Sequence, residues 1–146
     1  MKKTILIALL FLSINVIAQH KNWDHIKALK VSFITEELEL SEKEAQKFWP
    51  LYNDYEKKTS DIRYHELRAI RKEIKENSNT LTDDQAKILI DKISNAENRL
   101  HELKTNFTTK ISTVISPKKI ILLKVVEEDF KRKMFDELKK RKKGKN

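Results

Sequence analysis

Apolar residues recur at steps of three and four along most of the chain, and the clearest run lies between Thr82 and Ile115. Its apolar positions, separated mainly by polar and charged residues, are Ala86, Leu89, Ile93, Ala96, Leu100, Leu103, Phe107, Ile111 and Val114. This spacing predicts an amphipathic helix over about residues 83–115. Ordering so long a helix costs more than its own stripe returns, so the stripe needs a partner.

A second run predicts a helix over about residues 42–77, preceded by a shorter one over about residues 23–39. Pro50 lies inside the second run, and we expect a kink there rather than an end, because the apolar stripe continues beyond it. Residues 76–80, Glu-Asn-Ser-Asn-Thr, form the clearest loop. The two long helices should therefore be joined by a short connection.

The last helix is expected to start at Pro117 and to be apolar on more than one side. Residues 120–126 read Ile-Ile-Leu-Leu-Lys-Val-Val, and Phe130, Met134 and Leu138 continue one face. A helix of this kind needs more than one neighbour. The additional face is covered within the domain, covered by a second copy, or left for a client.

Each of the three long helices is preceded by a short motif typical of a helix N-terminus. In LTDDQ, the Thr82 hydroxyl is placed to accept from the backbone of Gln85, whose side chain reaches back to Thr82, as in a capping box. LSEKE offers the same arrangement. The residues of the two motifs are Leu40, Ser41 and Glu44, and Leu81, Thr82 and Gln85.

The third motif, ISPKK, is incomplete. Ser116 is a suitable N-cap, and Pro117 follows it in the first helical position, where its missing N–H is not needed. Lys119 stands where a capping box has Glu or Gln. We therefore expect a helix start without the reciprocal bond.

Composition agrees with few, long elements. The 146 residues include one glycine and two prolines, while 36% are charged. Sandwiches and barrels need many turns, and turns need glycine and proline. The sequence predicts an all-α fold of four helices, an elongated bent hairpin, in a single domain over residues 19–138 followed by a basic tail over residues 139–146.

The N-terminus has the features of a secretory signal peptide over residues 1–18. Lys2 and Lys3 precede an apolar stretch over residues 4–17, and we expect cleavage after Ala18 or Gln19. The alternative is an uncleaved membrane anchor, for which the stretch is short. The chain has no cysteine, so it contains no disulfide. The sequence favours a cleaved, exported, periplasmic protein.

The net charge of +9 is concentrated at the two ends. Residues 131–146 hold nine Lys or Arg against two acidic residues, so the body over residues 19–130 is neutral. The tail over residues 139–146 contacts an acidic membrane surface, attracts acidic client segments, or is a solvated helix end. Nucleic acid is a poor fit, because the tail lacks interleaved aromatic residues.

With these motifs, the chain resembles the Spy/CpxP family of periplasmic helical stress proteins, including relatives labelled periplasmic heavy-metal or stress sensors. LTDDQ at residues 81–85 matches the LTxxQ signature, LSEKE at residues 40–44 matches it with two substitutions, and the segment AQKFWPLY at residues 45–52 is similar to the sensor group. The resemblance implies a curved hairpin that pairs into a cradle-like homodimer and holds unfolded clients without ATP. Lys119 and the basic tail depart from the family pattern.

Candidate client-binding residues lie on the helix over residues 42–77. Aromatic residues there either bind clients or form core, and basic residues either attract clients or line a solvated face. The candidates are the aromatic residues Trp49, Tyr52, Tyr55 and Tyr64 and the basic residues Arg63, Arg68, Arg71 and Lys72.

Metal binding and catalysis have weaker signals. His20 and His25, near the expected new N-terminus, are the first candidates for a metal ion. His65 and His101 are expected at different distances from the loop, and neither lies in an HExxH motif. One glycine excludes a glycine-rich phosphate loop, so the sequence favours a binding protein without cofactor over an enzyme.

Three functions remain open on the sequence. The leading one is a periplasmic, ATP-independent chaperone-like protein that holds unfolded or stress-damaged envelope proteins. The alternative is a periplasmic sensor or regulator of envelope or metal stress that acts through one specific partner. The third is a structural protein that contacts the membrane surface through its basic tail.

Overall fold

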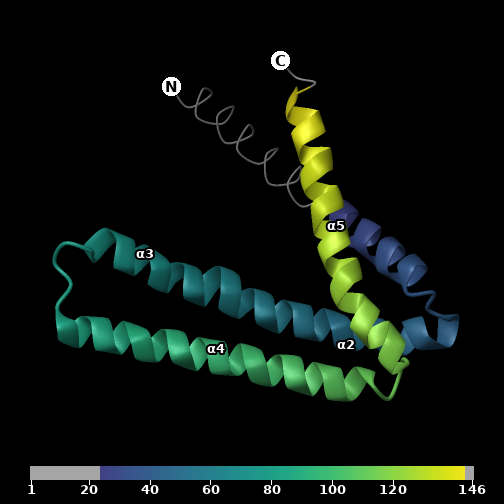
Figure 1. Ribbon diagram of the computed structural model, residues 1–146, viewed down its shortest axis with the longest axis horizontal. Coiled ribbons are helices and arrows are strands. Elements are labelled where there is room, and N and C mark those ends of the chain that lie inside the picture. Colours follow the sequence, from purple (N-terminus) through teal and green to yellow (C-terminus); the bar gives the residue numbers. More distant parts are fainter. Residues whose placement is uncertain (1–23, 144–146) are drawn as a thin grey trace, which may run out of the picture. The chain divides into compact units, whose positions relative to one another are not determined.

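The computed structural model describes residues 24–143, with side chains to residue 140 (Figure 1). Within this range the chain is helical apart from short connections and contains no strand, so the predicted all-α class is confirmed. The predicted signal peptide (residues 1–18), His20 and the end of the tail (residues 144–146) lie outside the described residues.

The chain forms two compact units. One is Ser41–Ile120; the other is made of Met1–Leu40 and Ile121–Asn146, of which residues 24–40 and 121–143 are described. Helix α5 (Pro117–Lys143) begins in the first unit and continues into the second. The two units are described separately below.

The unit Ser41–Ile120 is an antiparallel helical hairpin. Its first arm consists of α2 (Glu42–Ser60), the π-helix η1 (Asp61–Glu66) and α3 (Leu67–Asn77), and its second arm is α4 (Asp83–Ile111) (Figure 1). The arms are joined by a short turn, which includes most of the predicted loop. The first arm does not end at Pro50, as expected from the continuing stripe.

The π-turn was not predicted, although the sequence carries its signal. From Ile62 onward the residues that face α4 are spaced by four: Ile62, Glu66, Ile70 and Ile74 are buried or half-buried. In a regular α-helix, a side chain four residues further along points about 40° further around the axis. A stripe with this spacing would therefore drift away from the partner helix. In η1 the N–H of Leu67 donates to Ile62 O, five residues earlier. The wide turn absorbs one residue and keeps the face on α4.

Helix α4 ends at Ile111, earlier than the predicted end near Ile115. Two hydroxyls bond to the final turn: Ser112 Oγ donates to Thr109 O at 2.7 Å and Thr113 Oγ1 to Lys110 O at 2.8 Å. Short hydroxyl side chains offer the backbone such alternatives to the helical ladder. Ile115 remains buried in the turn that follows, so the apolar pattern outlasts the helix.

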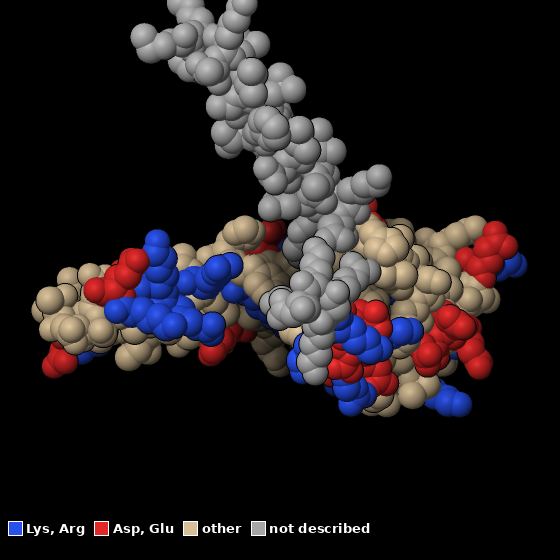
Figure 2. Space-filling view, turned by 90° about the horizontal axis from the view of Figure 1, so that it is seen from above, with Lys and Arg blue, Asp and Glu red and all other residues tan. Residues whose placement is uncertain are grey.

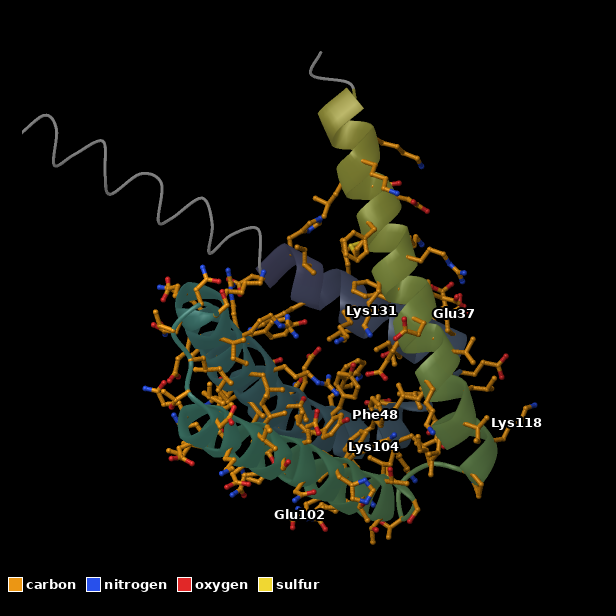
Figure 3. All side chains as sticks on the ribbon, turned by 60° about the vertical axis from the view of Figure 1, so that its left-hand side comes forward. Glu37, Phe48, Glu102, Lys104, Lys118 and Lys131 are labelled. Carbon is orange, nitrogen blue, oxygen red and sulfur yellow. The ribbon has the colours of Figure 1, made fainter. Side chains whose placement is uncertain are left out.

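Aromatic rings form the centre of the hairpin core. Phe48 and Tyr52 stack with their centroids 5.4 Å apart, and Tyr55 stacks on Phe107 across the hairpin at 4.3 Å, nearly parallel. Phe48 points into the space between the arms, whereas the labelled Glu102 points away from it (Figure 3). Thr59 is also buried, and its hydroxyl is satisfied there because it donates to Tyr55 O at 2.9 Å.

The second unit pairs a helix over residues 24–37 with the part of α5 beyond residue 120. Phe33 and Phe130 lie 5.7 Å apart, and Lys133 Nζ lies 5.0 Å above the Phe33 ring. The short helix ends with Glu39 at φ 47°, and Leu40 N–H donates to Thr35 O at 3.0 Å. A left-handed residue in this position is typical of a Schellman C-cap, where glycine is preferred.

Candidate functional site

The two complete helix-start motifs are capping boxes. Ser41 N–H donates to Glu44 Oε2 at 2.9 Å, and Glu44 N–H donates to Ser41 Oγ at 3.3 Å. Thr82 N–H donates to Gln85 Oε1 at 3.0 Å, and Gln85 N–H donates to Thr82 Oγ1 at 3.3 Å. These bonds satisfy backbone donors that the first helical turn leaves open. The LTxxQ-type residues therefore cap the N-termini of α4 and α2.

The third helix start is connected to the first. Ser116 Oγ accepts from Lys119 N–H at 3.4 Å, and Pro117 opens α5. The Lys119 side chain does not complete a capping box; its Nζ donates to Glu44 Oε2 at 2.7 Å. The two side chains are 22% and 24% exposed. The Lys119 ammonium, followed by Ser41 N–H, lowers the pKa of Glu44.

Three of the four aromatic candidates for client binding lie in the hairpin core or at its margin. Tyr52 is 1% exposed and offers no binding surface. Trp49 and Tyr55 are half-buried; Trp49 lies against Phe48 and Tyr52, with centroid distances of 5.2 and 5.4 Å. Of the two readings of these aromatics, the core reading fits their packing. Leu40 is likewise buried, and Leu81 is half-buried.

The basic candidates share one exposed surface, which we call the η1–α3 face. Figure 2 shows Lys and Arg gathered over the end of the hairpin that contains α3. The exposed members of the face are Arg63, Tyr64, Arg68, Arg71 and Lys72. Tyr64, the last of the four aromatic candidates, is 65% exposed. Its spacing from Arg68 and Arg71, four and seven residues, places the three on one side of the helix.

Three acidic residues of η1 and α3 form ion pairs, two of them with α4 and the third, Glu76, with Lys72 of the η1–α3 face. Glu66 pairs with Arg99, and Glu73 Oε2 lies 3.9 Å from Lys92 Nζ. In the described part of the chain, Arg63, Arg68 and Arg71 form no ion pair. Two carboxylates of this part of the arm therefore pair with α4, while three guanidinium groups stay exposed to solvent.

Two open hollows lie beside these ion pairs. The first, of about 310 Å³, is lined by residues of both arms: Lys58, Asp61, Ile62, Arg99, Glu102, Leu103 and Asn106. The second, of about 430 Å³, is lined by Glu66, Ile88, Asp91, Lys92, Asn95 and Arg99. Both mix charged and apolar side chains on an open surface, a shape suited to an extended chain rather than to an enclosed small molecule.

Among the described residues, no group of three or more His, Asp or Glu side chains is arranged to hold a metal ion. His25 is exposed, as are His65 and His101. His65 and His101 each lie within two residues of the Glu66–Arg99 pair, and neither belongs to such a group. In residues 24–143, no helix is both long enough and apolar enough to span a membrane.

A scan of protein-family models, a search of curated proteins and a search of solved structures each found no match to the chain. Its function is therefore argued from its exposed surfaces and from the resemblance carried by its motifs.

Proposed function

We propose that the protein is a periplasmic, ATP-independent binding protein that holds unfolded or stress-damaged envelope proteins, in the manner of the Spy/CpxP family that it resembles. The observation that carries this proposal is the η1–α3 face, where exposed Tyr64 lies among exposed arginines without ion-pair partners in the described chain. Positive charge accelerates encounter with acidic segments, and apolar contact prolongs the complex.

The surface suits an unfolded chain better than a folded ligand. It lies on a helical surface, and the nearby hollows are open. Ile88 and Ile90 add exposed apolar side chains on α4. Scattered apolar and basic groups of this kind offer many weak contacts to a flexible chain and no single fixed pose.

Holding does not require nucleotide in this proposal. With a single glycine, at position 144, the chain has no means of building a glycine-rich phosphate loop. Release would follow when the client buries its own apolar residues, because a folded client offers the surface fewer contacts. Export by the N-terminal segment and pairing into a homodimer belong to the same proposal, on the strength of the sequence and the resemblance.

The direct test is suppression of aggregation. Purified protein, at stoichiometric amounts and without ATP, should keep several chemically unfolded acidic proteins in solution. The double variant Arg68→Glu/Arg71→Glu should lose most of this effect and should become more effective toward basic clients. The matched control Lys43→Glu/Lys47→Glu changes the same charge on exposed positions of α2 and should retain the effect.

Wild-type protein that suppresses aggregation of none of these clients would refute the proposal. Crosslinking in intact cells distinguishes it from the alternative, a sensor acting through one partner. Many unrelated envelope proteins are expected as crosslinked partners. Recovery of one protein alone, in stoichiometric yield, would favour the sensor or regulator instead.

A further inference from the structure

The solvent side of α5 carries a second stripe that the fold does not use. Its residues alternate at steps of four and three, and all six are exposed: Ile121, Val125, Glu128, Arg132, Phe135 and Lys139. We call them the α5 seam. Ile121, Val125 and Phe135 are 65%, 54% and 65% exposed. This 3.5-residue spacing is the one by which helices pair as coiled coils.

The buried residues of α5 lie on a different side of the helix. Leu123, Val126 and Phe130 are buried, and Phe130 contacts Phe33 of the short helix within the same unit. Phe130 and Arg132 are two positions apart, which places them about 160° apart around the helix. The α5 seam is thus a separate apolar and charged stripe, beyond the one that already has a partner.

The residues of the α5 seam are ordered so that the seam of one copy can pair with the seam of a second copy running in the opposite direction. When a second copy is laid antiparallel, Val125 meets the partner's Phe135, and Glu128 meets the partner's Arg132. Ile121 then lies against the partner's Lys139, whose methylene groups cover it. Each of these contacts occurs twice across a two-fold axis, as a symmetric dimer interface requires.

We propose that the occupant of the α5 seam is a second copy of this chain, paired antiparallel through two Val125–Phe135 contacts and two Glu128–Arg132 ion pairs. Parallel pairing in register would place Glu128 against Glu128 and Arg132 against Arg132, so like charges disfavour it. This inference rests on the homodimer of the proposed function and adds the surface and the direction of pairing. Its interface differs from the η1–α3 face, so its tests can fail without affecting client holding.

The charges beside the seam are compatible with this arrangement. Within one helix, Lys131 Nζ lies 2.7 Å from Glu128 Oε1, and Arg132 pairs with Asp129. These four residues sum to zero charge in each copy. Two copies therefore bring together a cluster of charges that sums to zero. Within it, Glu128 and Arg132 can pair with the other copy either in place of their partners on the same helix or in addition to them.

Charge exchange tests the pairing. Glu128→Arg and Arg132→Glu should each weaken self-association by about ten-fold or more, because each places like charges at the centre. The double variant E128R/R132E should restore it. A mixture of the two single variants should form a heterodimer, since opposite charges then meet at both central positions. Glu97→Arg and Lys87→Glu, exposed on α4, are controls that should leave it unchanged.

Disulfide trapping tests the direction, because the chain has no cysteine of its own. Val125→Cys and Phe135→Cys should not crosslink with themselves, since ten residues separate the two positions by about 15 Å along the helix. Mixed together under oxidising conditions, they should crosslink. Crosslinking of Val125→Cys with itself would show parallel pairing and overturn the proposal.

Sedimentation across a range of concentrations supplies the remaining measurement. Helical content of each variant, measured by circular dichroism, shows that loss of association is not loss of folding. A wild-type protein that stays monomeric throughout would overturn the proposal, even if the α5 seam then proved to bind clients. A dimer insensitive to both charge reversals would overturn it as well.

Discussion

Lys119 Nζ donates to Glu44 Oε2 at 2.7 Å, and this bond joins the first turn of α5 to the first turn of α2. Glu44 Oε2 also accepts from Ser41 N–H, so a single carboxylate oxygen serves two helix starts. All three residues involved, Ser41, Glu44 and Lys119, belong to the short motifs at the starts of α2 and α5. In the folded chain, two of these local signals become one tertiary contact.

Replacing Glu44 by glutamine should isolate the charge of this contact. Glutamine retains the capping box, as Gln85 shows in α4, but loses the carboxylate that pairs with Lys119. In a double-mutant cycle with Lys119→Met, the coupling should be about 1 kcal/mol, as for a partly exposed pair. Urea unfolding of the four proteins measures it, and a coupling near zero would show that the pair adds nothing.

Stability should depend on pH through the same residue. The pKa of Glu44 is lowered in the folded protein, mainly by Lys119, so the unfolded chain binds a proton more readily. The contribution is full above the ordinary value of 4.5 and is lost as pH falls through the lower folded pKa. The stability difference between wild type and Glu44→Gln should be constant near neutral pH and shrink below about pH 4.5. The same measurement on Lys119→Met, which removes the ammonium that pairs with Glu44, should show a smaller pH dependence than the wild type.

Phe107 should be among the most costly core residues to truncate. Its ring stacks on Tyr55 and lies 6.0 Å from Tyr52, edge to face. Phe107→Ala removes both contacts and should destabilise the hairpin by about 3–5 kcal/mol. Tyr64→Ala, which removes an exposed ring, should cost about 0.5 kcal/mol or less. Thermal unfolding followed by circular dichroism compares the two, and equal losses would contradict the packing.

Deleting one residue from η1 should be tolerated. Without Arg63 the six-residue π-turn becomes an ordinary α-turn, and the faces on either side keep their direction. Deleting Lys57, in the regular part of α2, displaces Thr59 and Ile62 from the interface and should cost about 3 kcal/mol. Denaturant unfolding measures both. A deletion of Arg63 as damaging as that of Lys57 would mean that the wide turn has another role.

Glycine substitution should have opposite effects at two nearby exposed positions. Glu39 has φ 47°, where a side chain costs about 1 kcal/mol, so Glu39→Gly should stabilise by up to that amount. Glu36 lies within the helix over residues 24–37, and Glu36→Gly should destabilise by about 1 kcal/mol. Shifts of the same sign in melting temperature would contradict this assignment of backbone geometry.

Helix starts were the most predictable part of the fold. Ser41, Thr82 and Ser116 each act within one turn of their own position, so local sequence is sufficient to find them. Ends were less predictable: α4 stops at Ile111 while the apolar spacing continues to Ile115. The π-turn could have been found from the four-residue steps after Ile62, since a regular helix does not hold such a stripe on one face.

The ion pairs between helices could not be predicted from the sequence. Glu66 and Glu73 each have several basic residues at helical spacing, and only the register of the two arms selects Arg99 and Lys92. For the same reason the aromatic candidates could not be divided in advance. Tyr52 and Tyr64 have the same chemistry, but the phase of the first arm buries one and exposes the other.

The Glu66–Arg99 and Glu73–Lys92 pairs hold the two arms of the hairpin at one common offset. Sliding one arm by a helical turn, about 5.4 Å, would break both pairs and separate Tyr55 from Phe107 at the same time. A force that pulls the arms past each other therefore meets all of these contacts together. A force that separates the two arms, starting at the loop end, breaks these contacts one after another. The hairpin is built to resist shear and to yield to peeling.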